Sequence, residues 1–325
     1  MEVNRPQTPD YETDLLIFDE KMLAEKSYWV ERLSDCIERP HLCLEPILKK
    51  PSHQYGIREW QIDAETYAKL VHLTGEQPIL VYATLMAALK ACLYKHTGDS
   101  LVVVGSPARR LDNTTYSSLN VLAIVNRLTD QISFQQLLID IRLTLLDAYA
   151  RQQYPYRYLI RDLGLKLTEE RFPLFDVMLV LKNIHITPKQ LNNDLVIEFE
   201  QTSGRLTGII KFDKGLFTDS SIELFIDRLL RILKKGLSNT SIPIADLELL
   251  TKKEFQQLLT EWNRTVTYYP PIKTIKDLFE EQVNHTPTTT AVIFEDTQLS
   301  YQELNQRSNQ LAHYLQRFGI GPETL

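Results

Sequence analysis

The hydrophobic and polar positions of the chain follow two periods, one typical of strands and one typical of helices. Apolar residues run without interruption over strand length at 101–104 and 175–181, and they alternate with polar residues at 195–200. Uninterrupted runs of this length are typical of strands buried on both faces of a sheet. The pattern therefore predicts strands at residues 56–62, 101–104, 119–128, 175–181, 195–200 and 207–213.

Between these strands, apolar residues recur three or four positions apart, which is the helical period. The expected helices are residues 14–33, 64–74, 79–96, 133–149 and 220–237, and a further helix that ends at Trp262. Segment 79–96 is apolar around almost its whole circumference, so we expect it to be buried. Pro78 suits the first turn of that helix, and Gly98 suits its end. The mixture predicts an α/β fold of the α+β sandwich type.

Composition and charge exclude several classes of protein. The 325 residues are 43% hydrophobic and 24% charged, as in ordinary globular proteins, and the net charge is -6. No basic cluster interleaved with aromatic residues indicates a nucleic-acid interface. No apolar run was expected to reach the ~18–20 residues that span a membrane. The N-terminal residues 1–14 are polar and acidic, unlike a signal peptide.

Cysteine usage indicates a reducing compartment. Cys36, Cys43 and Cys92 show neither a Cys-x-x-Cys spacing nor a partner histidine at metal-ligand spacing. We therefore expect reduced thiols in a cytoplasmic protein and no metal site, with Cys92 in the core of its apolar helix.

Five segments resemble one enzyme family. RQQYPYRYL at 151–159 and RFPLFDVMLVLKN at 171–183 resemble two motifs of the C-terminal lobe of the condensation domain in nonribosomal peptide synthetases. LVVVGSPARR at 101–110 and LNVLAIVNRL at 119–128 resemble two others, and YWVERL at 28–33 resembles the start of that lobe. The matching positions are Gly105, Pro107, Arg110, Val125, Asn126, Gln152, Pro155, Tyr156, Arg171 and Pro173.

The end of the chain resembles a different domain of the same synthetases. After the linker-like prolines at 270–271, residues 299–304 (LSYQEL) and 309–312 (NQLA) are similar to the first motif of an adenylation domain. Its matching positions are Leu299, Tyr301, Glu303 and Leu304. We therefore expect the C-terminal half of a condensation domain at residues 1–249, without the N-terminal lobe, a linker at 250–273, and the start of an adenylation domain at 274–325.

The resemblance implies a fold and a set of partners. The first region should be a single condensation lobe with a chloramphenicol-acetyltransferase-like fold, followed by a short adenylation fragment. The parent synthetase is expected to use ATP, Mg and phosphopantetheine on a carrier domain, with no cofactor held by this chain. Its partners should be the remainder of the adenylation domain, the carrier domain, and a complementary condensation lobe or a tailoring protein.

The sequence lacks the catalytic motif of the family. Condensation domains carry a His-His-x-x-x-Asp-Gly motif, and a histidine is suited to accept a proton near neutral pH. None of the seven histidines stands beside another or precedes Asp-Gly at this spacing. No phosphate-binding Gly-x-x-x-x-Gly-Lys loop is present either. We therefore assign no catalytic residue, and we expect Arg110 to be solvated or paired locally.

Two positions depart from the family pattern. Leu122 stands where glycine is usual, and Arg127 stands where threonine is usual. The first hypothesis is therefore a catalytically inactive half-domain that heads an initiation module and acts as a structural platform for its adenylation domain. The second is half of a peptide-bond-forming enzyme, completed by a lobe that carries the histidine motif. The third is a binding module that recruits a carrier protein or a tailoring partner.

Overall fold

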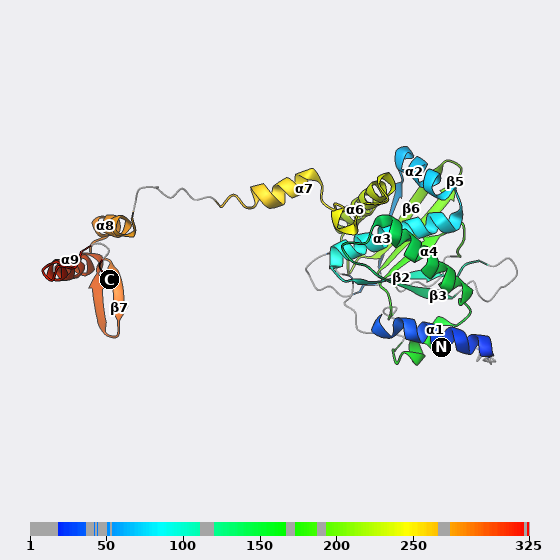
Figure 1. The fold of residues 1–325 in the computed structure, drawn as a ribbon, viewed down its shortest axis with the longest axis horizontal. Helices are drawn as coiled ribbons and strands as arrows, with labels where there is room; N and C mark the ends of the chain where they lie inside the picture. The colour runs from blue at the N-terminus through cyan, green and yellow to red at the C-terminus, as the bar shows by residue number, and fades with distance from the viewer. Residues whose placement is uncertain are drawn as a thin grey trace, which may run out of the picture. The chain divides into compact units, whose positions relative to one another are not determined.

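The computed structural model describes residues 19–36, 42, 44, 51–52, 54–110, 120–166, 173–186, 193–265, 274–321 and 324. Contacts divide the chain into two compact units, residues 1–255 and 256–325, and each is described by itself (Figure 1). The expectations for Cys43, Arg171 and the prolines at 270–271 fall outside the described residues.

The first unit is built on a six-stranded sheet with the order β1-β6-β5-β4-β2-β3. β4 is parallel to its neighbours β2 and β5, whereas the other pairs are antiparallel. Every residue of β4 is buried, as its continuous apolar run predicts. The strands are β1 (Tyr55–Gln61), β2 (Leu101–Pro107), β3 (Val121–Arg127), β4 (Val177–Leu181), β5 (Leu195–Thr202) and β6 (Arg205–Asp213).

Four helices of this unit pack together, with α3 contacting the other three and the sheet (Figure 1). They are α2 (Ala64–Thr74), α3 (Pro78–Thr97), α4 (Phe134–Ala150) and α6 (Asp219–Ser238). A second pair, α1 (Glu20–Leu33) and α5 (Tyr156–Asp162), make contact with each other. Two short 3-10 turns, η1 (Ser34–Cys36) and η3 (Ile244–Asp246), complete the unit.

Helix α3 is the buried apolar helix that the sequence predicts, with Pro78 in its first turn. Gly98 ends it in the left-handed conformation at φ 74°, where glycine is favoured. At 20 residues α3 is long and apolar enough to cross a membrane, so the expectation that no run approaches this length was wrong. However, 72% of its apolar window is buried inside the fold, which is the position of a core helix.

Two helix predictions need correction. Helix α1 begins at Glu20 rather than at residue 14, because Asp19 is its N-cap and accepts a hydrogen bond from the Met22 amide at 2.8 Å. A short polar side chain at the N-cap satisfies an amide that would otherwise have no partner. The helix expected to end at Trp262 is a short α7 (Lys252–Gln256) continued by a π-helical turn (Gln257–Glu261).

Two glycines fix the pairing of β1 with β6. Gly56 lies opposite Phe212, and Trp60 lies opposite Gly208. A Cβ atom added to either glycine would stand 2.3 Å from the facing ring, which is far inside van der Waals contact. Each ring therefore occupies the space that the Cβ atom of any residue other than glycine would fill.

The described residues of the second unit after 273 form two helices and a hairpin. They are α8 (Ile275–His285), β7 (Thr290–Phe294), β8 (Thr297–Ser300) and α9 (Tyr301–Gln316). Strands β7 and β8 pair antiparallel, and the Phe279 and Tyr301 rings lie 6.0 Å apart. Apolar side chains remain largely exposed in this unit, including Ile293 and Phe294.

Candidate functional site

Several motif positions meet at the end of β2, in a cluster that we call the β2 junction (Pro107–Arg110, Asn120 and Gln152–Tyr156). Its centre is Gln152, which is 2% exposed. The Gln152 side chain accepts a hydrogen bond from the Arg109 amide at 2.8 Å and donates to the Arg109 carbonyl at 3.2 Å. The Gln152 side-chain amide thus makes the two hydrogen bonds to the Arg109 backbone that a neighbouring strand could make. These bonds join two motifs that lie over 40 residues apart in the sequence.

Asn120 and Glu25 hold the other side of the junction. Asn120 Nδ2 donates to the carbonyls of Gln152 and Tyr154, and its Oδ1 accepts from the Tyr156 amide at 2.9 Å. Glu25, on α1, accepts from the amides of Gln153 and Tyr154. Burial raises the pKa of the Glu25 carboxyl above its usual value. The segment before α5 is therefore fixed by side chains rather than by sheet pairing.

Gly105 has a packing role beside the junction. A Cβ atom at this position would stand 2.3 Å from the Phe175 ring, so only glycine leaves room for it. The Phe175 ring in turn packs at 5.7 Å from the ring of Tyr156, and both are buried. Pro155 takes the N-cap position of α5, at φ -69°. Gly105, Pro155 and Tyr156 thus shape the junction through packing and backbone conformation.

A chain of buried polar side chains lies behind Pro107. Tyr82 Oη is 2.8 Å from Ser106 Oγ, which is 3.2 Å from Tyr149 Oη. Tyr149 Oη is 2.8 Å from His185 Nε2, and the Leu181 amide donates to His185 Nδ1 at 3.0 Å. Because Nδ1 accepts, the neutral ring carries its proton on Nε2 and donates it to Tyr149.

Burial, together with the smaller effect of the nearby Arg109 guanidinium, lowers the pKa of His185 to about 3. Protonation would also place a hydrogen on Nδ1, where the Leu181 amide already points. Burial likewise raises the pKa of the Tyr82 and Tyr149 hydroxyls above their usual values. His185 is therefore a neutral structural histidine near pH 7 and is unsuited to act as a general base.

Arg110 is exposed, and its backbone is hydrogen-bonded to the fold. Its amide donates to the Ile184 carbonyl at 2.9 Å. Arg109 pairs with His185 through an isolated backbone bridge, and its side chain is also exposed. Pro173 is half-buried, and Arg171 lies outside the described residues. The junction therefore presents two guanidinium groups to solvent at the end of β2.

Val125 and Asn126 lie elsewhere, at the far end of β3. Pro107 pairs with Val121 and Leu101 with Arg127, so Asn126 is five residues along β3 from the junction, roughly 17 Å away. Here an open groove of about 450 Å³ follows the outer strand of the sheet. This β3 groove is lined by Arg32, Asp35, Leu101, Val125, Asn126, Arg127, Leu137, Asp140, Leu143, Thr144 and Asp147.

Charges of both signs surround the β3 groove. Arg32 donates to Thr144 Oγ1 at 3.1 Å, and Arg127 stands 4.0 Å from Asp35. Both members of the Arg127–Asp35 pair are well exposed, so water screens the pair and its contribution to stability is small. The replacement of threonine by Arg127 therefore adds a mobile charge at the rim without anchoring the strand.

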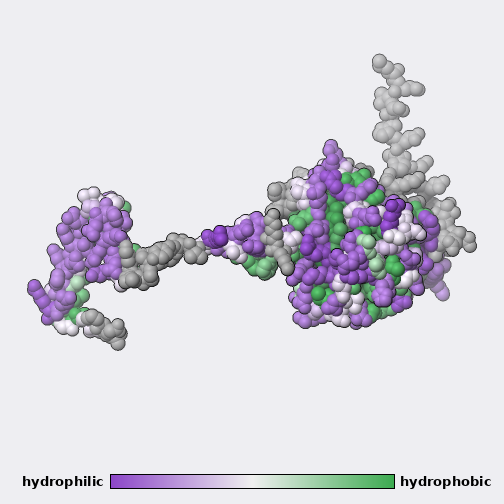
Figure 2. Space-filling view, turned by 90° about the horizontal axis from the view of Figure 1, so that it is seen from above, coloured by the Kyte–Doolittle hydropathy of each residue, from purple (hydrophilic) through white to green (hydrophobic). Residues whose placement is uncertain are grey.

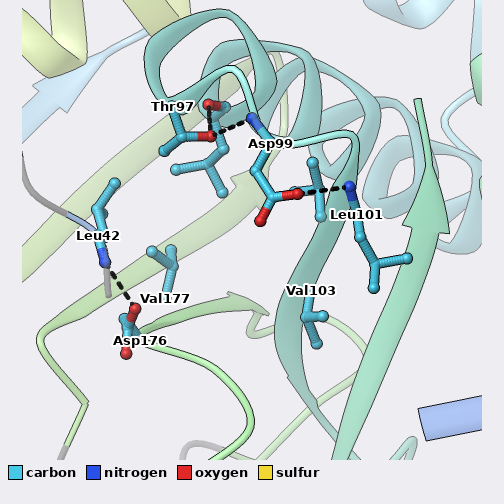
Figure 3. A pocket seen from close by; sticks show the side chains of 9 residues that line it. Leu42, Thr97, Asp99, Leu101, Val103, Asp176 and Val177 are labelled. Atoms are coloured by element: carbon cyan, nitrogen blue, oxygen red, sulfur yellow. Dashed lines mark hydrogen bonds between the residues drawn. The ribbon is translucent and has the colours of Figure 1, made fainter. Parts of the chain in front are cut away.

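A small cavity of about 40 Å³ lies beside the first half of β2 (Figure 3). Its polar side chains are already used by the backbone. Asp176 accepts from the Leu42 amide, Asp99 accepts from the Leu101 amide, and Thr97 accepts from the Asp99 amide. The space suits at most a few water molecules, and the cavity offers no site for a substrate.

The four adenylation-motif positions span the end of β8, which holds Leu299, and the first turn of α9. Ser300 is the N-cap of α9, and its hydroxyl accepts from the Glu303 amide while Glu303 accepts from the Ser300 amide. These hydrogen bonds lower the pKa of Glu303. Leu299, Tyr301 and Leu304 are each partly buried. Part of the motif is thus a capping box, a local structural signal.

Sequence patterns identified residues of the β2 junction but not the polar side chains that lie behind it. Tyr82, Ser106, Tyr149 and His185 lie on separate segments, and no spacing predicts that they meet. One signal was available for Lys90, which is the only charge in the apolar middle of α3 and is completely buried. Within the described segments, no group of histidine, cysteine or acidic residues could hold a metal ion.

Comparison with known proteins agrees with this geometry. Residues 12–259 match the condensation domain and residues 279–325 match the AMP-binding enzyme family. The chain belongs to the condensation-domain family and continues into the start of an AMP-binding domain, the arrangement of a nonribosomal peptide synthetase. This confirms the resemblance and the mixed α/β fold expected from the sequence.

Particular relatives are large synthetases. Gramicidin S synthase 2 of Brevibacillus brevis is 33% identical over 324 residues, covering 93% of this chain and 7% of that protein. Bacitracin synthase 1 of Bacillus licheniformis is 30% identical, covering 94% of this chain and 6% of that protein. The chain thus spans less than a tenth of the length of these curated relatives.

Solved structures share the fold. A four-domain nonribosomal peptide synthetase bound to AMP and glycine matches with a TM-score of 0.72 at 16% identity, covering 94% of this chain and 26% of that one. The X-domain from teicoplanin biosynthesis matches with a TM-score of 0.59 at 18% identity, covering 74% of this chain and 58% of that one.

Proposed function

We propose that this segment is a catalytically inactive condensation lobe that serves as a structural platform for the adenylation domain of an initiation module. An initiating module needs no upstream acyl donor, so it does not need the condensation reaction. The observation that carries the proposal is the structural role of His185, which is buried, neutral near pH 7 and hydrogen-bonded to Tyr149 and the Leu181 amide. ATP, Mg and phosphopantetheine would then be bound by other segments of the synthetase.

The β2 junction supports this role because its side chains hydrogen-bond to the backbone. The Gln152 and Asn120 side chains and Glu25 Oε2 form hydrogen bonds to backbone groups, which supports a role of these positions in stabilising the fold. Leu122 is 1% exposed and packs in the core. The glycine usual at this position can therefore be replaced here by a large apolar side chain.

The first test is the sequence of the intact protein around this segment. A His-His-x-x-x-Asp-Gly segment in the same reading frame would contradict the platform proposal. The second test is enzymatic: the chain is mixed with an acyl thioester donor and an aminoacyl thioester acceptor, and amide formation is measured. We expect the rate to equal that of the thioesters alone.

The same assay distinguishes the alternative of a half-enzyme. Two exposed guanidinium groups, Arg109 and Arg110, stand at the junction where a second lobe could pair with them. If a separately produced lobe that carries the histidine motif restores amide formation, and the R110A variant abolishes the restoration, this chain is half of a catalyst. If no histidine-bearing lobe restores activity, the platform proposal stands.

A partner-binding function is the third candidate, and an apolar row on α4 favours it. Ile139, Leu143 and Leu146 are 42%, 53% and 43% exposed, and their spacing places them on one face of the helix. Figure 2 shows green hydrophobic areas between hydrophilic ones on the surface of the larger unit. A structure of an X-domain of similar fold was solved as a complex with the protein OxyB. Loss of carrier or tailoring-protein binding in an L143E variant would support this candidate.

A further inference from the structure

Lys90 is the unusual residue of the central helix. It is completely buried, and its Nζ donates to the Val102 carbonyl at 3.2 Å, the Ile124 carbonyl at 2.7 Å and Asn126 Oδ1 at 2.7 Å. None of these acceptors is a carboxylate. The amine therefore acts through hydrogen bonds to β2 and β3 and not through an ion pair.

The direction of these hydrogen bonds determines the orientation of Asn126. Lys90 Nζ is the donor in all three hydrogen bonds, so the Asn126 oxygen faces Lys90 and the Asn126 amide nitrogen faces away from it. That nitrogen donates to Thr144 Oγ1 at 3.0 Å, and the Thr144 hydroxyl donates to the Asp140 carbonyl at 2.8 Å. Arg32 donates to the same Thr144 oxygen at 3.1 Å.

The chain of hydrogen bonds runs from the core to the β3 groove. Asn126, Thr144 and Arg32 all line that groove, whereas Lys90 lies behind it. Asn126 Oδ1 accepts a hydrogen bond from Lys90 in the core. The wall of the β3 groove therefore presents N–H donors from Asn126 and Arg32. Without an internal donor, the Asn126 amide could turn its oxygen toward the groove.

We propose that Lys90 is a positioning residue that fixes the Asn126 amide with its N–H groups toward the β3 groove. It also holds β3 in register, because a shift of one residue would move Asn126 to the other face of the sheet. The proposal concerns the described geometry of the groove and holds whether the segment is a platform, a half-enzyme or a binding module.

The test observes the Asn126 side chain directly by NMR. The full chain is labelled with 15N-asparagine, and hydrogen exchange of the side-chain amides is followed in wild type, K90M and L89A. K90M keeps an apolar stem of similar length without the donor, and L89A perturbs the same buried helix without touching the amine. We expect K90M to lose about tenfold in exchange protection at Asn126 Nδ2, as for the loss of one buried hydrogen bond.

Asn120 provides the internal reference, since its Nδ2 is hydrogen-bonded to the β2 junction and has no contact with Lys90. Its protection should be unchanged in K90M. Unchanged protection of Asn126 in K90M would overturn the proposal. An equal loss in L89A would also overturn it, because the effect would then come from general loosening of the core.

A second pair of variants keeps Lys90 and covers the case in which K90M does not fold. N126D offers the amine a carboxylate of the same shape, and N126L offers no acceptor. If Lys90 donates to position 126, N126D should unfold at a higher urea concentration than N126L, because a buried carboxylate is tolerated only beside a donor. Equal midpoints, or a lower midpoint for N126D, would overturn the proposal.

Discussion

The two units of the chain differ in how far their apolar side chains are buried. In the first unit, the strands β2, β4 and β5 and the helix α3 bury nearly all their apolar side chains in one core. Among the described residues of the second unit, Val283 is the one hydrophobic side chain that is buried. Ile275, Phe294 and Phe318 are 88%, 71% and 65% exposed there.

The difference shows that secondary structure can form without a stable hydrophobic core. The second unit has good local signals, including capping boxes at Thr274 and Ser300. Local signals specify where helices begin, but most helical stability in proteins comes from packing an apolar face. Helices and strands therefore form in this unit although most of its described apolar side chains, such as Ile293 and Phe294, stay exposed.

The largest expected effect is in hydrogen exchange. Amides of β7 and β8 should exchange at least about 100-fold faster than those of β4 and β5, because exchange in weakly packed segments needs only local opening. Exchange followed by mass spectrometry on the full chain measures both. Similar rates in the two units would contradict the comparison and show that the second unit has stability of its own.

A matched pair of phenylalanines comes next. Phe175 is completely buried against Gly105, whereas Phe294 is 71% exposed. F175A should lower the free energy of unfolding by about 3–5 kcal/mol, because it removes a buried ring and leaves a cavity. F294A should change it by less than about 0.5 kcal/mol. Urea denaturation of both variants checks the difference, which would vanish if Phe175 were not part of the core.

His185 predicts a pH dependence of the first unit. Its pKa falls from 6.5 to about 3 on folding, so the folded state resists protonation. Its stabilising contribution is complete above pH 6.5 and is lost as the pH falls toward 3, by about 2 kcal/mol at pH 5. The H185Q variant should show a shallower loss of stability between pH 6.5 and 4 than wild type.

The matched control for this experiment is H285Q, which changes an exposed histidine of the second unit. Its stability profile should follow that of wild type. If the stability of H185Q and of H285Q falls with pH at the same slope, the buried hydrogen bonds of His185 do not control the acid sensitivity of the fold.

The smallest effect compares two capping boxes. Thr218 caps α6 in the first unit, and Ser300 caps α9 in the second. T218A and S300A should each cost about 1 kcal/mol. In α6 the cost should appear in global unfolding, because Ile222 and Phe225 tie its first turns to the core. In α9 it should appear as roughly fivefold faster exchange of its first-turn amides only.

Much of the fold could be predicted because burial imposes periodicity. The helix 64–74 was predicted to the residue, and β4 was predicted within two residues at its start. Helix α1 was predicted to begin too early, because Asp19 breaks the helix with its side chain while the apolar pattern continues past it. A hydrophobic pattern shows which face is buried but does not show where a cap ends the helix.

The site was harder to predict, because it depends on which strands become neighbours. Gly105, Gln152 and Tyr156 were singled out by resemblance, and the structure brings them together. Asn126 was grouped with them, but it lies at the other end of β3 beside a separate groove. Lys90 and His185 act through hydrogen bonds across the sheet, and sequence spacing carries no information on such contacts.

The pairing of β1 with β6 has a consequence for folding. These strands lie about 150 residues apart in the chain and close the sheet at one edge, so their contact is among the most costly in loop-closure entropy. The rings of Phe212 and Trp60 fit only over Gly56 and Gly208, so a strand that arrives one residue out of place meets a Cβ atom where it needs empty space. Pairings of β1 with β6 in a shifted register should therefore dissociate quickly. Only the correct register of this slowly formed pair should persist.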